Sequence, residues 1–463
     1  MKLPSFFTKS FVLMLALAFV ASACTSTPTP IPPVPQPLPA TSAPGLPTPP
    51  ASAPTQLPAL PGDKILLSKL ARVQSPSVPG NDLTQLAQGN NAFAMALYQD
   101  LRSSSDGNLF FSPYSISLAL AMVYAGAGGN TQTQMAQALH FNLPPERLHP
   151  AMNALNQKIA SYAQANNAPG QGFHLNIANA IWGQDGFPFL PAYLDLLAQD
   201  YGAGMHVADF IHAAEPTRQV INGWVEQQTQ GKITNLFPQG SLDDTTRLVL
   251  ANAIYFKAAW ESPFDPASTA NAPFTLADGS QTSIPMMHSK SDSSYLYAQG
   301  SNYQAVGLPY AGSGVMMVVL MPTAGSFANF EAGLTDAQLE GILTGMAETP
   351  LNLEMPKFKT ESQFDLKSTL ASLGMPDAFT GQADFSGMDG QKDLFIGNVF
   401  HKAYVNVDEN GTEAAAATGV AMMSMAMPAQ PQNVTINHPF LFFIFDPQTQ
   451  TILFMGRMLN PGQ

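Results

Sequence analysis

The residue types that perform hydrolysis or bind metals do not fall into any familiar spacing in this chain. The motifs G-x-S-x-G, H-E-x-x-H and G-x-x-x-x-G-K-[ST] are all missing from the sequence. The stretch from Asn406 to Gly411 is similar to the start of a calcium loop, but its twelfth position is Ala417, where the ion needs a bidentate glutamate. The eight histidines show no metal-ligand spacing. We therefore expect a protein that is not an enzyme and that has no metal site and no cofactor.

The single cysteine, Cys24, stands where an exported protein receives a lipid. The chain begins with basic residues, followed by the apolar run Phe11–Val20. This run is too short to span a bilayer, and the pattern predicts a signal peptide over residues 1–23. The small residues 21–23 directly before Cys24 are similar to a bacterial lipobox, although Ala21 replaces the commoner leucine. The alternative is an ordinary cleaved signal and a free thiol. A lone exported thiol would be reactive, which favours a lipid anchor at Cys24.

Composition divides the rest of the chain into a linker and one large domain. Residues 24–62 hold 14 of the 40 prolines and no charged residue, which predicts an extended tether that cannot form a core. Residues 63–463 contain no such stretch and no repeat. The whole chain has 45% hydrophobic residues, enough to bury a large core. A net charge of −13 and only 11% charged residues argue against nucleic-acid binding.

One uncharged segment is unusual for a surface loop. Gly411–Met427 reads GTEAAAATGVAMMSMAM, with no proline and no charge after Glu413. On its own the segment fits a surface connection or a short alanine-rich helix. Alternate positions from Thr412 to Met422 nevertheless carry small or apolar groups, so the segment could also pack inside a sheet as a strand.

The elements that must hold this segment are predicted by periodicity. Helical spacing over Asn91–Arg102 and the pair Ser112-Pro113 predict two early helices, the second ending at Gly126 as a C-cap. Later stretches read as strands and as a final hairpin: Leu248–Trp260, Val315–Met321, Val399–Val407, Phe440–Phe445 and Thr451–Met455. Helices come early and antiparallel strands later, so we expect an α+β fold.

Several segments in order resemble one family, the inhibitory serpins. The hinge motif is Asn410-Gly-Thr-Glu-Ala-Ala-Ala-Ala-Thr418. The other segments are similar to the family's early helices, its third main-sheet strand and its C-terminal strands: residues 108–139, 221–238, 246–260, 437–446 and 454–461. The resemblance implies a large, mostly antiparallel main sheet, surrounding helices and an exposed reactive loop.

The resemblance also implies a mechanism. Serpins are suicide inhibitors of serine and some cysteine proteases: the protease cleaves the loop, forms an acyl-enzyme, and is trapped when the loop inserts into the main sheet. Counting from the hinge glutamate Glu409 places the reactive bond at Met425–Ala426. Counting back from the C-terminal strands gives Pro428 instead, and Met423 and Met427 are secondary candidates. Methionine suits elastase-, chymotrypsin- or subtilisin-like pockets.

Further residues are assigned by the resemblance alone. The hinge comprises Glu409, Gly411, Thr412, Glu413, Ala414, Ala415, Ala416, Ala417 and Thr418. Four residues match the family's shutter, a hydrogen-bonded group beneath the point where the main sheet opens: Ser112, Ser115, Asn252 and His401. Trp260 matches a tryptophan at the top of the sheet, where the loop first enters. These residues would control opening of the sheet, and the plainer interpretation is core structure.

Two functional hypotheses follow from the sequence. The first is a monomeric, lipid-anchored inhibitor of a serine protease, placed outside the cell envelope or released from it. The second is a non-inhibitory serpin that acts as a binding module. In the family, heparin-binding members use a basic helix D, and the region directly after Asn130 is nearly free of Lys and Arg, so we expect no heparin-type polyanion partner.

Overall fold

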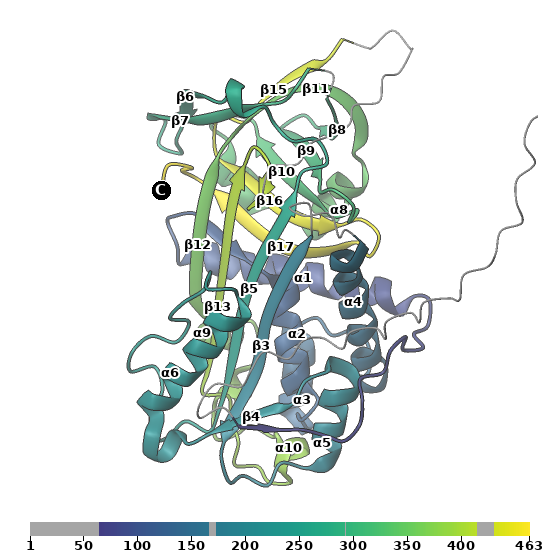
Figure 1. The fold of residues 1–463 in the computed structure, drawn as a ribbon, viewed down its shortest axis with the longest axis vertical. Helices are drawn as coiled ribbons and strands as arrows, with labels where there is room; N and C mark the ends of the chain where they lie inside the picture. The colour runs from purple at the N-terminus through teal and green to yellow at the C-terminus, as the bar shows by residue number, and fades with distance from the viewer. Residues whose placement is uncertain (1–63, 166–172, 292, 414–429) are drawn as a thin grey trace, which may run out of the picture. The chain divides into compact units, whose positions relative to one another are not determined.

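The computed structural model describes residues 64–165, 173–291, 293–413 and 430–463, all within the unit Leu57–Gln463. The described residues form two large sheets with helices around them (Figure 1). The expected α+β class with mostly antiparallel sheets is confirmed.

The helices lie mainly in the first half of the chain. They are α1 (Asp82–Ser103), α2 (Pro113–Tyr124), α3 (Gly129–Ala138), α4 (Pro145–Ala165), α5 (Pro191–Leu196), α6 (Phe210–Gln228), α7 (Phe327–Gly333), α8 (Asp336–Thr344), α9 (Lys367–Ser372) and α10 (Ser386–Asp389), with shorter turns η1 (Leu197–Tyr201), η2 (Pro266–Ser268) and η3 (Pro376–Phe379). Within the described ranges, no helix is both long enough and apolar enough to cross a membrane.

The first sheet has the strand order β1-β4-β3-β5-β14-β13-β12. Its strands are β1 (Lys64–Leu66), β3 (His174–Gln184), β4 (Met205–Ala208), β5 (Leu248–Ala259), β12 (Phe358–Asp365), β13 (Asn398–Asp408) and β14 (Gly411–Thr412). β5 is buried on both faces except at Lys257, as its nearly continuous apolar sequence predicts. Two pairs of neighbouring strands in this sheet are parallel: β3 with β4, and β5 with β13.

The second sheet has the order β2-β17-β16-β10-β9-β8-β11-β7-β6, and β15 pairs with β11. Its strands are β2 (Leu109–Phe111), β6 (Ala270–Thr275), β7 (Gln281–His288), β8 (Ser294–Gln299), β9 (Tyr303–Pro309), β10 (Met316–Pro322), β11 (Ala347–Pro356), β15 (Gln432–Thr435), β16 (Phe440–Asp446) and β17 (Thr451–Met458). The predicted C-terminal hairpin is present as β16 and β17, which pair antiparallel.

α2 lies under the first sheet and is buried at every residue. The side chain of Ser112 caps it by accepting the Ser115 amide hydrogen, and Pro113 begins the helix, as predicted. The predicted C-cap at Gly126 is wrong, because the helix ends at Tyr124 and Ala125 caps it in a right-handed conformation that needs no glycine. α2 therefore presents a fixed N-terminus to the sheet.

α6 covers the opposite face of the same sheet (Figure 1). Ile221 and Val225 of α6 pack in one apolar cluster with Trp182 of β3 and with Val249 and Ala251 of β5. The sheet is thus covered by a helix on each face, and a new strand can join it only at an edge or by separating strands within the sheet plane.

The chain before α1 closes one edge of the first sheet. β1 pairs antiparallel with β4, and the Arg72 guanidinium donates to Asn153 at 2.8 Å and to Asn156 at 2.7 Å on α4. The Val73 amide donates to the Gln199 carbonyl oxygen at 2.9 Å. The pairing with β1 satisfies the outer edge of β4, and the contacts of Arg72 and Val73 attach this segment to α4 and η1.

Candidate functional site

The candidate site is the boundary between β5 and β13, which we call the seam. Residues 398–404 of β13 pair in parallel with residues 249–255 of β5. Beyond that stretch the two strands separate, and β14 lies between them. β14 is antiparallel to both neighbours, with Thr412 opposite Val407 on β13 and opposite Ala258 on β5. The seam therefore already holds the first two residues of an additional strand.

Both residues of β14 fit this place tightly. The side chain of Thr412 is fully buried, and its hydroxyl is 2.8 Å from the Tyr310 hydroxyl. Gly411 has φ 153°, and a β-carbon there would lie 2.1 Å from the Ala258 carbonyl oxygen. Gly411 and Thr412 therefore lie inside the sheet, because a glycine allows close backbone approach and the threonine hydroxyl finds a partner.

We expect Gly411→Ala to destabilise the protein by about 2 kcal/mol, since the added methyl group clashes with backbone atoms of β5. Urea unfolding measures the loss, and hydrogen exchange at the amides of β14 should become faster. The matched control is Gly107→Ala, because a β-carbon at Gly107 meets no atom within 4 Å. Equal stability of the two variants would contradict the close fit.

Glu413 ends the added strand. Its backbone has φ 51°, an uncommon conformation for a residue with a side chain, and its amide donates to the Asn406 carbonyl oxygen at 3.0 Å. The Glu413 carboxylate is 2.9 Å from the Lys232 ammonium and accepts from the Tyr255 hydroxyl. Burial acts to raise the pKa of Glu413, but hydrogen bonds from Tyr255, Lys232 and Tyr404 outweigh it and hold the pKa below its usual value.

The turn between β13 and β14 is fixed by Trp260 and Glu409. The Trp260 indole donates to the Asp408 carbonyl oxygen at 2.9 Å, and its ring stacks on Tyr310 with centroids 4.6 Å apart. The Glu409 carboxylate is 2.8 Å from the Lys357 ammonium and also accepts from Thr269. Burial acts to raise the pKa of Glu409, but the hydrogen bonds from Lys357 and Thr269 keep it below its usual value.

Halfway along the seam, three polar side chains join three strands. His401 of β13, Asn252 of β5 and Asn179 of β3 stand in register beside one another. His401 Nδ1 hydrogen-bonds the Asn252 side-chain oxygen, and the Asn252 amide group donates to the Asn179 oxygen. Separating β5 from β13 must therefore break the contact between His401 and Asn252.

The N-terminus of α2 anchors the same network from below. The Asn252 amide group donates to the Ser115 carbonyl oxygen at 2.8 Å and to its hydroxyl at 2.9 Å. The Ser112 amide donates to His401 Nε2 at 3.1 Å. Because Nε2 accepts, Nδ1 must carry the proton, so His401 is a neutral imidazole with one defined tautomer. Four of the predicted residues, Ser112, Ser115, Asn252 and His401, thus meet in one place.

We expect acid to destabilise the protein through two buried histidines. Burial lowers the pKa of His401 to about 3 and that of His149 to about 4. The unfolded chain takes up these protons near pH 6.5, so the unfolded state binds more protons than the folded state below that pH, and stability falls as the pH falls from 6.5 toward 4. At pH 5 each histidine costs about 2 kcal/mol.

Urea unfolding from about pH 7.5 to pH 5 measures this loss. The variant His149→Gln should show a shallower pH dependence, because it removes one of the two titrating groups. An unfolding free energy that is constant over the same interval would contradict the prediction.

Some predicted residues lie outside the described part of the chain. They are Cys24, Ala414, Ala415, Ala416, Ala417, Thr418, Met425 and Ala426. Their assigned roles stay predictions.

Comparison with known proteins identifies the family. The sequence model described as "Serpin (serine protease inhibitor)" matches residues 88–461. The chain belongs to the serpin family.

Known serpins match this one along their whole length. The human leukocyte elastase inhibitor is 39% identical over 391 residues, which covers 82% of this chain and all of the relative. Human serpin B4 is 36% identical with the same coverage. Among solved structures, the thermophilic serpin tengpin in its native state has a TM-score of 0.73 at 28% identity, covering 86% of this serpin and 99% of tengpin. Uncleaved ovalbumin has a TM-score of 0.71 at 26% identity, covering 81% and 100% of the two chains.

Sequence reasoning missed several residues that complete the site in this serpin. Asn179 could have been recognised in the sequence, because it is a polar residue on the face of β3 that otherwise carries the apolar residues Leu175, Ile177 and Ile181. Tyr310 and Lys357 had none, since each meets the hinge only through the pairing of distant strands. Lys232 likewise lies 181 residues from Glu413 in sequence.

Proposed function

We propose that this serpin is an irreversible inhibitor of serine proteases that traps the acyl-enzyme by inserting its cleaved loop at the seam. In this proposal it acts as a monomer, one inhibitor per protease, with no metal or cofactor. The protein supplies a bait segment and a sheet that accepts it, and the chemistry of peptide cleavage belongs to the protease.

The observation that carries the proposal is β14. Gly411 and Thr412 already pair with both strands of the seam in antiparallel register. Further insertion extends an existing strand and needs no new nucleus. It also replaces one parallel ladder, between β5 and β13, by two antiparallel ladders, which are slightly more stable per residue.

The insertion explains why the protease stays trapped. The acyl-enzyme links the loop to the protease, so the inserting strand pulls on the protease active site. Deacylation requires a catalytic triad and an oxyanion hole held in place, and a distorted site has neither. The intact inhibitor is kinetically trapped before cleavage, because the network of His401 and Asn252 keeps the seam closed.

We propose that the target is an elastase-like protease, with chymotrypsin- and subtilisin-like enzymes as further targets, and that cleavage occurs at Met425–Ala426. Two observations support this: the uncharged methionines of the loop, and the presence of leukocyte elastase inhibitors among the relatives of this chain. An unbranched apolar side chain suits the apolar specificity pocket of such enzymes.

The test is complex formation with a neutrophil-type elastase. We expect a covalent complex that survives boiling in SDS, and mass spectrometry of its released peptide should identify Met425–Ala426 as the cleaved bond. Cleavage at Met423 or Met427 would move the reactive bond but keep the mechanism. Complete recovery of protease activity after cleavage, across elastase, chymotrypsin and subtilisin, would refute inhibition and favour a binding module.

We also propose that Cys24 carries a lipid and holds this serpin on the outer side of a bacterial envelope. The support is the signal-like segment and the small residues before the cysteine. Mass spectrometry of the mature N-terminus should find a diacylglyceryl group on Cys24, and Cys24→Ser should release the protein into the medium. An unmodified Cys24 in a membrane-free protein would contradict the anchor.

A further inference from the structure

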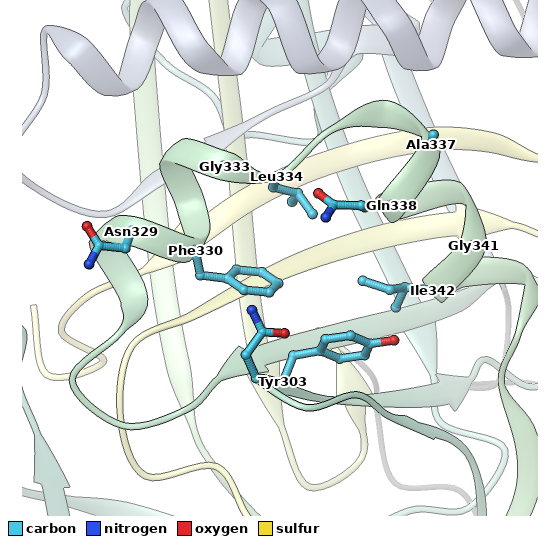
Figure 2. A pocket seen from close by; sticks show the side chains of 10 residues that line it. Tyr303, Asn329, Phe330, Gly333, Leu334, Ala337, Gln338, Gly341 and Ile342 are labelled. Carbon is cyan, nitrogen blue, oxygen red and sulfur yellow. The ribbon is translucent and has the colours of Figure 1, made fainter.

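A pocket of about 360 Å³ lies on the second sheet, away from the seam, between the start of β9 and helices α7 and α8 (Figure 2). Phe330 of α7 and Tyr303 of β9 present aromatic rings to it, with centroids 6.1 Å apart and tilted by 52°. Leu334 and Ile342, both buried, are also part of its lining. The volume of the pocket lies in the range typical of small-molecule sites, and its lining combines these apolar groups with polar carboxamides.

The polar groups of the pocket are neutral. Asn302, Asn329 and Gln338 contribute carboxamides, and no lining residue carries a charge. The Gln338 side-chain oxygen accepts the Thr335 amide hydrogen at 3.1 Å in the cap of α8, which fixes the side chain in place. A charged ligand would meet no opposite charge in this lining, so the pocket favours uncharged molecules.

Two glycines border the pocket: Gly333 ends α7, and Gly341 lies within α8 at a cost to helix stability. A β-carbon at Gly333 or at Gly341 would meet no atom within 4 Å, and neither residue has a positive φ. Neither conformation nor crowding therefore requires a glycine. Gly341 lies inside α8, where glycine is the least favourable residue after proline. The space is kept empty although almost any side chain would stabilise the helix.

We propose that this pocket is a binding site for an uncharged aromatic small molecule. The ligand's ring packs beside Phe330 and Tyr303 on the floor of Leu334 and Ile342, and its polar atoms hydrogen-bond the carboxamides at the rim. This activity is separate from protease trapping, because the pocket contains no residue of the seam.

A neighbouring cavity provides an internal control. It measures about 310 Å³, lies between α1 and α8 and reaches β16 and β17, and it is lined by the carboxylates of Asp336 and Glu340 together with Ala92 and Met95. An aromatic cation suits this second cavity better than a neutral ring does, because its carboxylates attract positive charge.

The test uses two dyes of similar shape. N-phenyl-1-naphthylamine is neutral, and 1-anilinonaphthalene-8-sulfonate carries a sulfonate. We expect the neutral dye to bind with a fluorescence increase and at least about tenfold more tightly than the sulfonate, because the pocket has no cation. Gly341→Leu should weaken the neutral dye about tenfold or more by filling the space, whereas Ala92→Leu, which fills the second cavity, should not.

Gly333→Leu fills the pocket from its other wall and should act like Gly341→Leu, so a folding defect in one variant cannot explain both results. Thermal midpoints and far-ultraviolet circular dichroism report folding of each variant. The proposal is overturned if both leucine variants fold and bind the neutral dye like the unchanged protein, if only Ala92→Leu reduces binding, or if the sulfonate binds as tightly as the neutral dye.

Discussion

The Thr412→Arg variant should be cleaved by the target protease without trapping it. Thr412 is already inside the sheet, fully buried, with its hydroxyl against Tyr310 and its backbone between Val407 and Ala258. An arginine there must either bury an unpaired charge or leave the seam. Burying an unpaired charge costs about 3 kcal/mol or more, which slows an insertion step roughly a hundredfold.

Deacylation then outruns insertion, and the inhibitor becomes a substrate. The measurement is the number of inhibitor molecules consumed per inactivated protease, together with the SDS-stable complex on a gel. Thr412→Ser is the matched control, because it keeps the hydroxyl that faces Tyr310 and should inhibit normally. An arginine variant that inhibits with unchanged stoichiometry would show that insertion does not pass through the position that β14 occupies.

Cleavage of the loop should make the protein more resistant to heat. In the intact protein β5 and β13 meet in a parallel ladder below β14. After cleavage the loop can continue from Thr412 along the seam and form antiparallel ladders with both strands. About a dozen added residues at about 1 kcal/mol of net hydrogen bonding each would contribute on the order of 10 kcal/mol.

A gain of that size predicts a clear shift of the unfolding midpoint. For a domain of about 400 residues the entropy of unfolding is such that about 1 kcal/mol corresponds to about 1 °C, so the midpoint should rise by about 10 °C or more. Scanning calorimetry before and after cleavage, by a protease that does not become trapped, measures the shift. The cleaved Thr412→Arg variant is the control and should keep its original midpoint. No rise in the unchanged protein would favour a non-inhibitory binding module.

These two predictions depend on different parts of the seam. The first depends on the place already taken by Thr412, and the second on the length of ladder between β5 and β13 that is still to be opened. The contact between Asn252 and His401 lies along that ladder, so we expect it to contribute to the barrier to opening.

Much of the fold followed from local patterns. Continuous apolar residues predicted β5 and β10, because a strand buried on both faces has no polar side to show. The serine and proline at positions 112 and 113 predicted the start of α2, since capping depends on residues close in sequence. The end of α2 was misjudged at Gly126, because glycine composition does not reveal the local backbone conformation.

The candidate site was predictable only in part. The hinge motif with its alanines predicted which segment would insert, and the resemblance assigned Ser112, Asn252 and His401 to one group of residues, which the structure brings together. That Gly411 and Thr412 already lie in the sheet was not predictable, because a two-residue strand has too few residues to show any periodicity. Glu413 illustrates the same limit, since its partners Lys232 and Tyr255 are remote from it in sequence.

The sequence by itself determined the class of the protein, the uncharged segment free of proline after Glu413 and the absence of any recognisable catalytic motif, because each depends on residue types in a short stretch or in a fixed order. Only the tertiary structure decided how far the hinge enters the sheet, which groups hold Thr412, Glu409 and Glu413, and where space remains beside α8. Those features arise where β5, β13 and β14, or β9, α7 and α8, meet from distant parts of the chain, and such contacts are set by packing and close backbone approach, which leave no pattern in the sequence.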